Sequence, residues 1–132
     1  MSRLFSYCIH TFRHSGTLQG EEAAGGSHKL AEGKVWKTGS ELWAEAERSG
    51  ARMPVIFSAA DVSSGLIFWA TIDDITVDYD NRRTECWYSG LRKIDPPRPR
   101  SALRLRAGNR RLSDKLIRPY AICQTPDFLI GR

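Results

Sequence analysis

The chain has 132 residues, of which 41% are hydrophobic and 27% are charged, a composition that is typical of one globular domain and excludes wholesale disorder. No apolar run approaches the ~20 residues that a membrane-spanning helix needs, so no such helix is expected. The formal net charge of +5 is unevenly distributed: residues 92–118 hold ten Lys or Arg and two acids and carry +8, which leaves −3 for the rest of the chain.

The N-terminal quarter predicts one strand followed by a long loop. Ser2–Phe12 alternates partly between apolar and polar residues, which is typical of a strand. Residues 14–33 are rich in Gly, Ser, Glu and Ala and predict a flexible loop. A loop of this length inside a compact domain is usually functional or disordered, and ordering on ligand binding is the alternative to disorder here.

A short helix is predicted next. Ser40 is a good N-cap for a helix over Glu41–Arg48, and Gly50 stands where such a helix ends. Trp43 shares a face with its apolar neighbours at helical spacing, so it is expected to pack in the core.

Three strands follow, over Met53–Ala60, Leu66–Val77 and Thr84–Ile94, and the last two are expected to form an antiparallel hairpin. Within the second strand the apolar face slips by one residue at Asp73 and Asp74. Such a slip indicates a β-bulge, and bulges bend strands where a sheet curls into a barrel.

The C-terminal third is less regular. Asp95–Arg100 contains three prolines and must be extended, whereas Ser101–Ala107 fits either a strand or a helix. Asn109–Ile117 is predicted to be helical. Pro119–Gln124 is predicted to be the last strand, and a short helical turn is expected after Thr125.

The three cysteines are Cys8, Cys86 and Cys123. Their odd number and wide spacing do not suit a disulfide framework, so they are expected to be buried thiols in a reducing compartment. The segment Met1–Ser15 lacks the features of a secretion signal. The sequence therefore predicts a cytoplasmic protein.

No metal or cofactor site is predicted. Cys8, His10 and His14 are three possible metal ligands, but no second cluster completes a structural zinc site. The sequence contains no phosphate-binding glycine loop, dinucleotide fingerprint or nucleophile elbow. Asp73 and Asp74 are adjacent on a strand and point to opposite faces, which favours a solvated strand end over an acid–base pair. Binding is therefore expected rather than catalysis.

Aromatic residues together with a basic segment favour a nucleic-acid ligand. Bases stack on aromatic faces while Lys and Arg neutralise phosphates. Trp36, Trp69, Trp87 and Tyr88 could line such a pocket, with core packing as the alternative role for each. A solvated basic face is the corresponding alternative for the cationic segment.

The order of elements resembles a known superfamily. The matching features are a helix over Ser40–Ser49, strands at Pro54–Ser58 and Gly65–Ala70, an aromatic strand at Cys86–Tyr88, and a proline-containing stretch followed by Leu103, Leu112 and Ile117–Arg118. This pattern resembles the PUA-like superfamily and is most similar to the EVE domain, with the ASCH and YTH domains as relatives. The resemblance covers residues 36–128.

The resemblance implies a single α+β domain over residues 1–132, a curled antiparallel or mixed β pseudobarrel with short flanking helices. It also implies a base-binding pocket, which in some relatives accepts a modified base. The implied pocket residues, with Trp87 added from the aromatic pattern, are Trp36, Lys37, Thr38, Ser58, Trp69 and Trp87. The expected phosphate contacts are Arg98, Arg100, Arg104, Arg106, Arg110 and Arg111.

These observations lead to three hypotheses. The first is a module that holds a base of RNA or DNA in an aromatic pocket beside a basic phosphate-binding face. The second is a protein-interaction or regulatory domain that binds an acidic partner. The third is a small RNA-processing enzyme whose cleavage depends on a metal ion or on His10.

Overall fold

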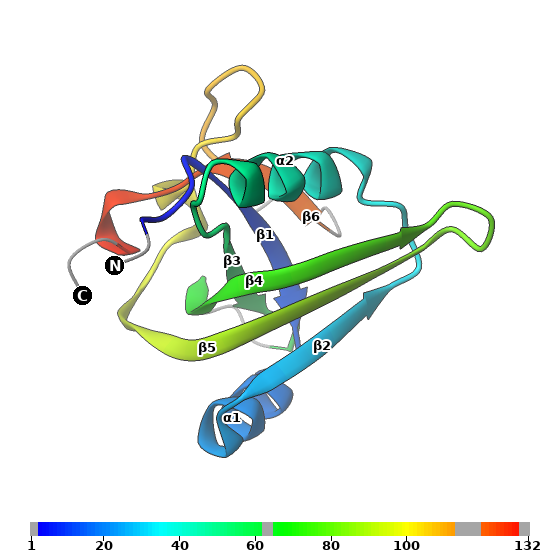
Figure 1. The fold of residues 1–132 in the computed structure, drawn as a ribbon. Helices are drawn as coiled ribbons and strands as arrows, with labels where there is room; N and C mark the ends of the chain where they lie inside the picture. The colour runs from blue at the N-terminus through cyan, green and yellow to red at the C-terminus, as the bar shows by residue number, and fades with distance from the viewer. Residues whose placement is uncertain (1–2, 62–64, 113–119, 130–132) are drawn as a thin grey trace.

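The computed structural model describes residues 3–61, 65–112 and 120–129. These residues form two α-helices and one mixed six-stranded sheet, in which the strands follow the order β2-β5-β4-β3-β1-β6 (Figure 1). The α+β class predicted from the sequence is confirmed. None of the described helices is long and apolar enough to cross a membrane.

Most neighbouring strands of the sheet pair antiparallel. They are β1 (Tyr7–Arg13), β2 (Ser27–Glu32), β3 (Pro54–Ala59), β4 (Leu66–Asp78), β5 (Arg83–Arg98) and β6 (Tyr120–Gln124). The helices are α1 (Ser15–Ala24) and α2 (Lys37–Arg48), and two 3-10 turns are η1 (Arg100–Ala102) and η2 (Asp127–Leu129). Among these six strands, β1 and β3 are the one parallel pair of neighbours, which requires a crossover, here through α1, β2 and α2.

Neighbouring residues of a strand point to opposite faces of the sheet. In this sheet apolar side chains cover both faces. Ile9, Val55 and Ala70 belong to a cluster that includes Leu42 and Ala46 of α2. A second cluster on the other face holds Cys8, Ile56, Trp69, Ala121, Cys123, Leu103, Leu105 and Leu112. All three cysteines are buried and free, as the sequence predicted.

The predicted central strands are confirmed, and so is the irregularity within β4. The register of β4 with β5 shifts between Ile72 and Asp74, where the apolar face slips by one residue. β5 continues through the prolines to Arg98, which pairs with Leu66. Gly65, next to this pair, has φ +74, and a Cβ there would collide with the carbonyl oxygen of Arg98. Glycine is therefore required for this close approach.

The expected curling into a closed pseudobarrel is not found, because the sheet is neither closed nor strongly curled. Closure would require β2 to pair with β6. The outer side of β6 is instead paired with residues 104–106: Arg106 N–H donates to Ile122 O at 2.9 Å, and Gln124 N–H donates to Arg104 O at 2.8 Å. These bonds occupy the edge that closure would use.

The prediction of a flexible loop over residues 14–33 is wrong, since this segment forms α1 and β2. The His14 side chain caps α1 by accepting from Gly16 N–H at 3.1 Å, and Leu18 is fully buried. Arg13 forms an ion pair with Glu21 at 2.8 Å. Tertiary contacts thus outweigh the low helix propensity of the glycines.

Two helix predictions also need correction. α2 begins at Lys37 rather than after Ser40. Ser40 is not the N-cap, and its hydroxyl donates to Lys37 O at 2.9 Å. Trp36 and Gly39 are buried, so packing extends the helix toward the N-terminus. Of the helix predicted over Asn109–Ile117, residues 109–112 are not helical and residues 113–117 lie outside the described ranges.

Candidate functional site

The most basic part of the described chain is a hairpin formed by residues 103–112, here called the basic hairpin. Leu112 N–H donates to Leu103 O at 2.9 Å, and Leu105 N–H donates to Arg110 O at 2.6 Å. Its turn has positive φ angles of 79° at Gly108 and 54° at Asn109. In Figure 1 the hairpin projects above the sheet, in the colour of residues near 105.

Alternation within the basic hairpin separates its apolar and charged side chains. Three leucines, Leu103, Leu105 and Leu112, lie in the second core cluster. Four arginines are exposed: Arg104, Arg106, Arg110 and Arg111. The buried leucines therefore anchor a short ribbon that carries its positive charge toward solvent.

A cavity of about 460 Å³ lies between the basic hairpin, β6 and the first turn of α2. This first cavity is lined by Thr38, Leu105, Arg106, Ala107, Arg110, Tyr120, Ala121 and Ile122. No carboxylate from the described residues is among these lining groups. The first cavity thus combines two guanidinium groups with one aromatic ring.

Tyr120 is held in place by packing. Its ring stacks on the fully buried Trp36, with 4.7 Å between the centroids and 21° between the planes. Burial raises the pKa of the Tyr120 hydroxyl, and a backbone hydrogen bond from Gly39 opposes this increase. The phenol therefore stays protonated and uncharged at neutral pH.

The first turn of α2 adds to the positive potential of the first cavity. A helix N-terminus carries a partial positive charge because its first N–H groups have no partner within the helix. α2 has no side-chain cap and no acidic residue in its first turn, and Thr38 lines the cavity directly. Arg106 and Arg110 reinforce this field, so the chemistry of the first cavity suits an anion.

The predicted pocket residues do not converge. Thr38 lines the first cavity, Lys37 is exposed beside it, and Trp36 lies behind Tyr120 without exposed surface. Trp69 and Ser58 are buried on the opposite side of the sheet from Trp36.

The remaining aromatic candidates lie elsewhere. Trp87 is 39% exposed on β5, where Lys29 lies 5.3 Å from its ring centroid. Tyr88 is fully buried, and its hydroxyl donates to Glu21 at 2.5 Å and contacts Arg13. The predicted aromatic residues therefore do not share one pocket.

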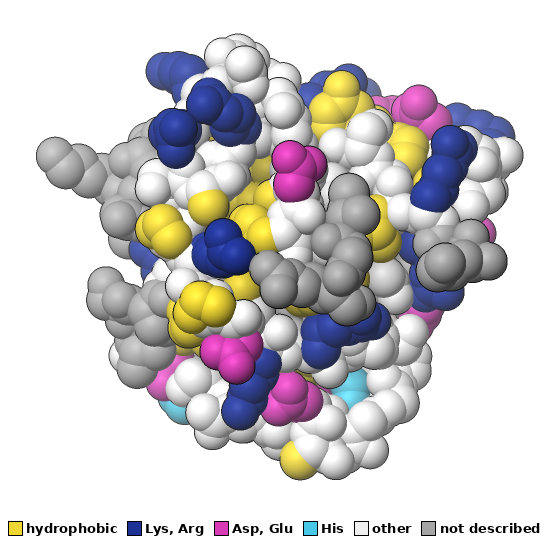
Figure 2. Space-filling model, turned by 90° about the vertical axis from the view of Figure 1, so that its left-hand side faces the viewer, with side chains coloured by type: hydrophobic (Ala, Val, Ile, Leu, Met, Phe, Trp, Pro, Cys, Tyr) yellow, Lys and Arg dark blue, Asp and Glu magenta, His cyan; other side chains and the backbone are white. Residues whose placement is uncertain are grey.

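The six predicted phosphate contacts fall into three groups. Arg106 and Arg110 line the first cavity, while Arg98 and Arg104 line a second cavity of about 570 Å³. The other two line neither of these cavities: Arg100 Nε donates to Ser58 Oγ at 3.2 Å, and Arg111 Nη1 donates to Ser101 O at 3.1 Å. Figure 2 shows Lys and Arg on one face in several separate groups, with acids between them, rather than in one patch.

His10 and Ser58 form a close pair at 2.8 Å between Nε2 and Oγ, the spacing of a base and a nucleophile. Arg100 can only donate, so Ser58 Oγ accepts from it, and the serine proton can be donated to a neutral His10. Burial, with Arg100 as a smaller cause, lowers the pKa of His10 to about 3. Because Ser58 has no exposed surface and His10 is a weak base, this pair is structural.

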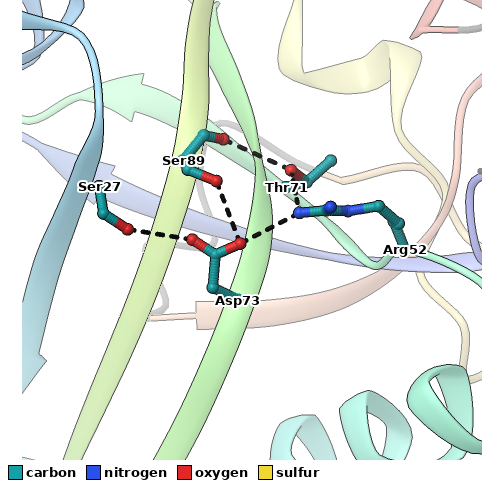
Figure 3. Close-up of polar contacts among 5 residues, drawn as sticks. All are labelled: Ser27, Arg52, Thr71, Asp73 and Ser89. Atoms are coloured by element: carbon teal, nitrogen blue, oxygen red, sulfur yellow. Dashed lines mark hydrogen bonds and ion pairs between the residues drawn. The ribbon is translucent and has the colours of Figure 1, made fainter.

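Asp73 is exposed, as expected, but it lies within β4 rather than at its end and is the centre of a polar network (Figure 3). Its Oδ1 accepts from Arg52 and from Ser89 Oγ, each at 3.0 Å, and its Oδ2 accepts from Ser27 Oγ at 3.1 Å. Arg52 also donates to Thr71 Oγ1 at 2.9 Å. Protein donors contact both carboxylate oxygens, so the network joins β2, β4 and β5.

The sequence did not identify Tyr120, the aromatic residue of the first cavity. Its position in the sequence could have pointed to it: Tyr120 is the first aromatic residue after the basic residues 92–118, and it begins the last strand. Its proximity to Thr38 depends on pairing between β1 and β6, which no local pattern predicts.

Comparisons with models of known protein families and with curated proteins find no match for this chain.

Proposed function

We propose that this protein binds nucleic acid at the first cavity, with a phosphate between Arg106 and Arg110 and a base against Tyr120. The observation that carries the proposal is the cavity itself, where two guanidinium groups, a helix N-terminus and an aromatic ring meet without a carboxylate among the described lining residues.

The chemistry of each group supports this ligand. Guanidinium groups bind phosphate oxygens in a two-pronged geometry, and helix N-termini favour anions. Bases of any sequence stack on aromatic rings. A volume of about 460 Å³ is within the range of cavities that hold small organic ligands, so it has room for a nucleotide unit.

The proposal keeps the resemblance to the PUA-like superfamily in the order of the helices and strands. It does not include the family's curled pseudobarrel, because the sheet is open. The implied pocket is also revised: Thr38 is retained, and Tyr120 takes the place of the buried Trp36 and Trp69. Recognition of a modified base is not part of the proposal, since no described group singles one out.

The test measures affinity for fluorescently labelled single-stranded RNA, single-stranded DNA and duplex DNA over a range of salt concentrations. The variant R106A/R110A is compared with R48A/R83A, which removes the same charge from exposed residues outside the described cavities. Loss of the contacts to this phosphate should lower the slope of log affinity against log salt by about 1. The control should keep the wild-type slope.

Tyr120 gives the second half of the test. Tyr120→Leu should weaken binding by about tenfold or more, and Tyr120→Phe should keep the wild-type affinity. If R106A/R110A and R48A/R83A behave alike, the first cavity is not the phosphate site. An acidic protein partner would depend on the same arginines, but it would not require an aromatic ring at position 120.

A further inference from the structure

A second cavity also adjoins the basic hairpin, at Arg104. Its volume is about 570 Å³, and it lies where η2 follows β6. The lining residues are Arg98, Ala102, Arg104, Gln124, Thr125, Pro126, Asp127 and Phe128. Like the first cavity, it brings two arginines and an aromatic ring together, here with one carboxylate on its wall.

The position of Arg98 in the second cavity is well defined. Its guanidinium carbon lies 4.8 Å from the centroid of the Phe128 ring, and its backbone is fixed by the close approach of Gly65. Its Nε is buried and has no hydrogen-bond partner in the described part of the chain. A buried N–H without a partner costs free energy, and an anionic ligand that accepts from Arg98 Nε would remove this cost.

Arg104 completes the positive side of the second cavity. It is exposed, and among the described residues its Nη1 donates to Asn109 O, at 3.3 Å. The carboxylate in the lining, Asp127, forms no ion pair with either arginine within the described ranges. Both arginines therefore keep charge available for a ligand.

The two cavities are neighbours along β6. Ile122 lines the first cavity and Gln124 lines the second, and these residues bond to Arg106 and Arg104, respectively. Residues two apart on an extended chain are about 7 Å apart, so one short ligand can reach both hollows. On the side of the molecule drawn in Figure 2, basic groups lie next to hydrophobic surface.

We infer that the ligand is single-stranded nucleic acid, and that the second cavity holds the nucleotides adjoining those in the first. This inference rests on the proposed function. Tyr120 lines the first cavity, and Phe128 lines the second with the guanidinium group of Arg98 over its ring. Only unpaired bases expose their faces for stacking on such groups. A duplex hides these faces, so it would use the arginines and leave both hollows unfilled.

The test is a length series of labelled single-stranded oligonucleotides, from a dinucleotide to about eight nucleotides, with the longest also offered as a duplex. In the wild-type protein, affinity should rise at least tenfold along the series. R98A/R104A should lose most of this increase and keep the affinity for the dinucleotide. R106A/R110A should weaken binding at every length, and R48A/R83A should follow the wild type.

Circular dichroism establishes that each variant is folded. If R98A/R104A is not, the single variant R104A, at an exposed position, tests the same expectation. If the folded variant shows the same rise in affinity with oligonucleotide length as the wild type, the inference is overturned and the proposed function still stands. Duplex binding as tight as single-strand binding also overturns it. Absence of binding at any length overturns the proposed function, and the inference with it.

Discussion

At the scale of single residues, burial separates aromatic side chains that can meet a ligand from those that cannot. Trp36 has no exposed surface, and its indole N–H lacks a partner among the described groups. Trp36→Ala should therefore destabilise the protein by about 3 to 5 kcal/mol, whereas Trp36→Phe, which keeps an aromatic ring, should lose much less. Urea unfolding measures both. Trp36→Ala with wild-type stability would instead mean that this side chain is not part of the core.

His10 should make stability depend on pH. Its folded pKa of about 3 lies below the ordinary value of 6.5, so below pH 6.5 the unfolded state binds a proton that the folded state does not. The free energy of unfolding should thus fall by about 1.4 kcal/mol per pH unit as the pH drops below that value.

Urea unfolding of the wild type and of His10→Gln between pH 7 and about pH 5 measures this contribution. Above pH 5 most carboxylates remain ionised in both states, so the difference between the two proteins reports on His10. The stability of His10→Gln should be less sensitive to acid. Equal pH dependence in both proteins would contradict the burial of a neutral His10.

At the scale of elements, the Asp73 network holds three strands together where β4 is irregular. Asp73→Ala removes the acceptor of three side-chain hydrogen bonds and should lower stability by about 1 to 2 kcal/mol, a modest value because the site is partly exposed. Asp80→Ala, on the exposed β4–β5 turn, is the matched control. Equal unfolding midpoints for the two variants would show that the network contributes nothing.

Alternation predicted individual strands well, because period-two burial is a local property of the chain. Burial alternates along the first part of β5, whereas every residue of β3 is buried, and the slip at Asp73 marked the irregularity in β4. The basic hairpin was missed in part. Its strand pattern at Leu103 and Leu105 was visible, but the positive φ values at Gly108 and Asn109 turn the chain where a helix was expected.

α1 was missed for a different reason. Its stability depends on distant partners, such as Tyr88 for Glu21 and Asp61 for Ser15, and not on its own glycine-containing sequence. No local pattern reports such contacts, so composition alone predicted a loop.

At the scale of the whole molecule, strand order decides which predicted residues meet. Alternation places a side chain on one face of its strand but gives neither the neighbours nor the register. Trp36 and Trp69 thus lie on opposite sides of the sheet, although the sequence suggested one pocket. Thr38, Arg106 and Arg110, predicted in separate roles, do meet, because β6 lies between the basic hairpin and α2.

Amide chemical-shift mapping by NMR tests the location of the site most directly. Addition of a single-stranded oligonucleotide should shift the signals of Thr38, residues 105–110 and residues 120–122 first, and those of Arg98, Gln124 and Thr125 as its length increases. Shifts centred on Trp87 and β2, or no shifts at any concentration, would contradict the assignment of the ligand to the cavities beside the basic hairpin.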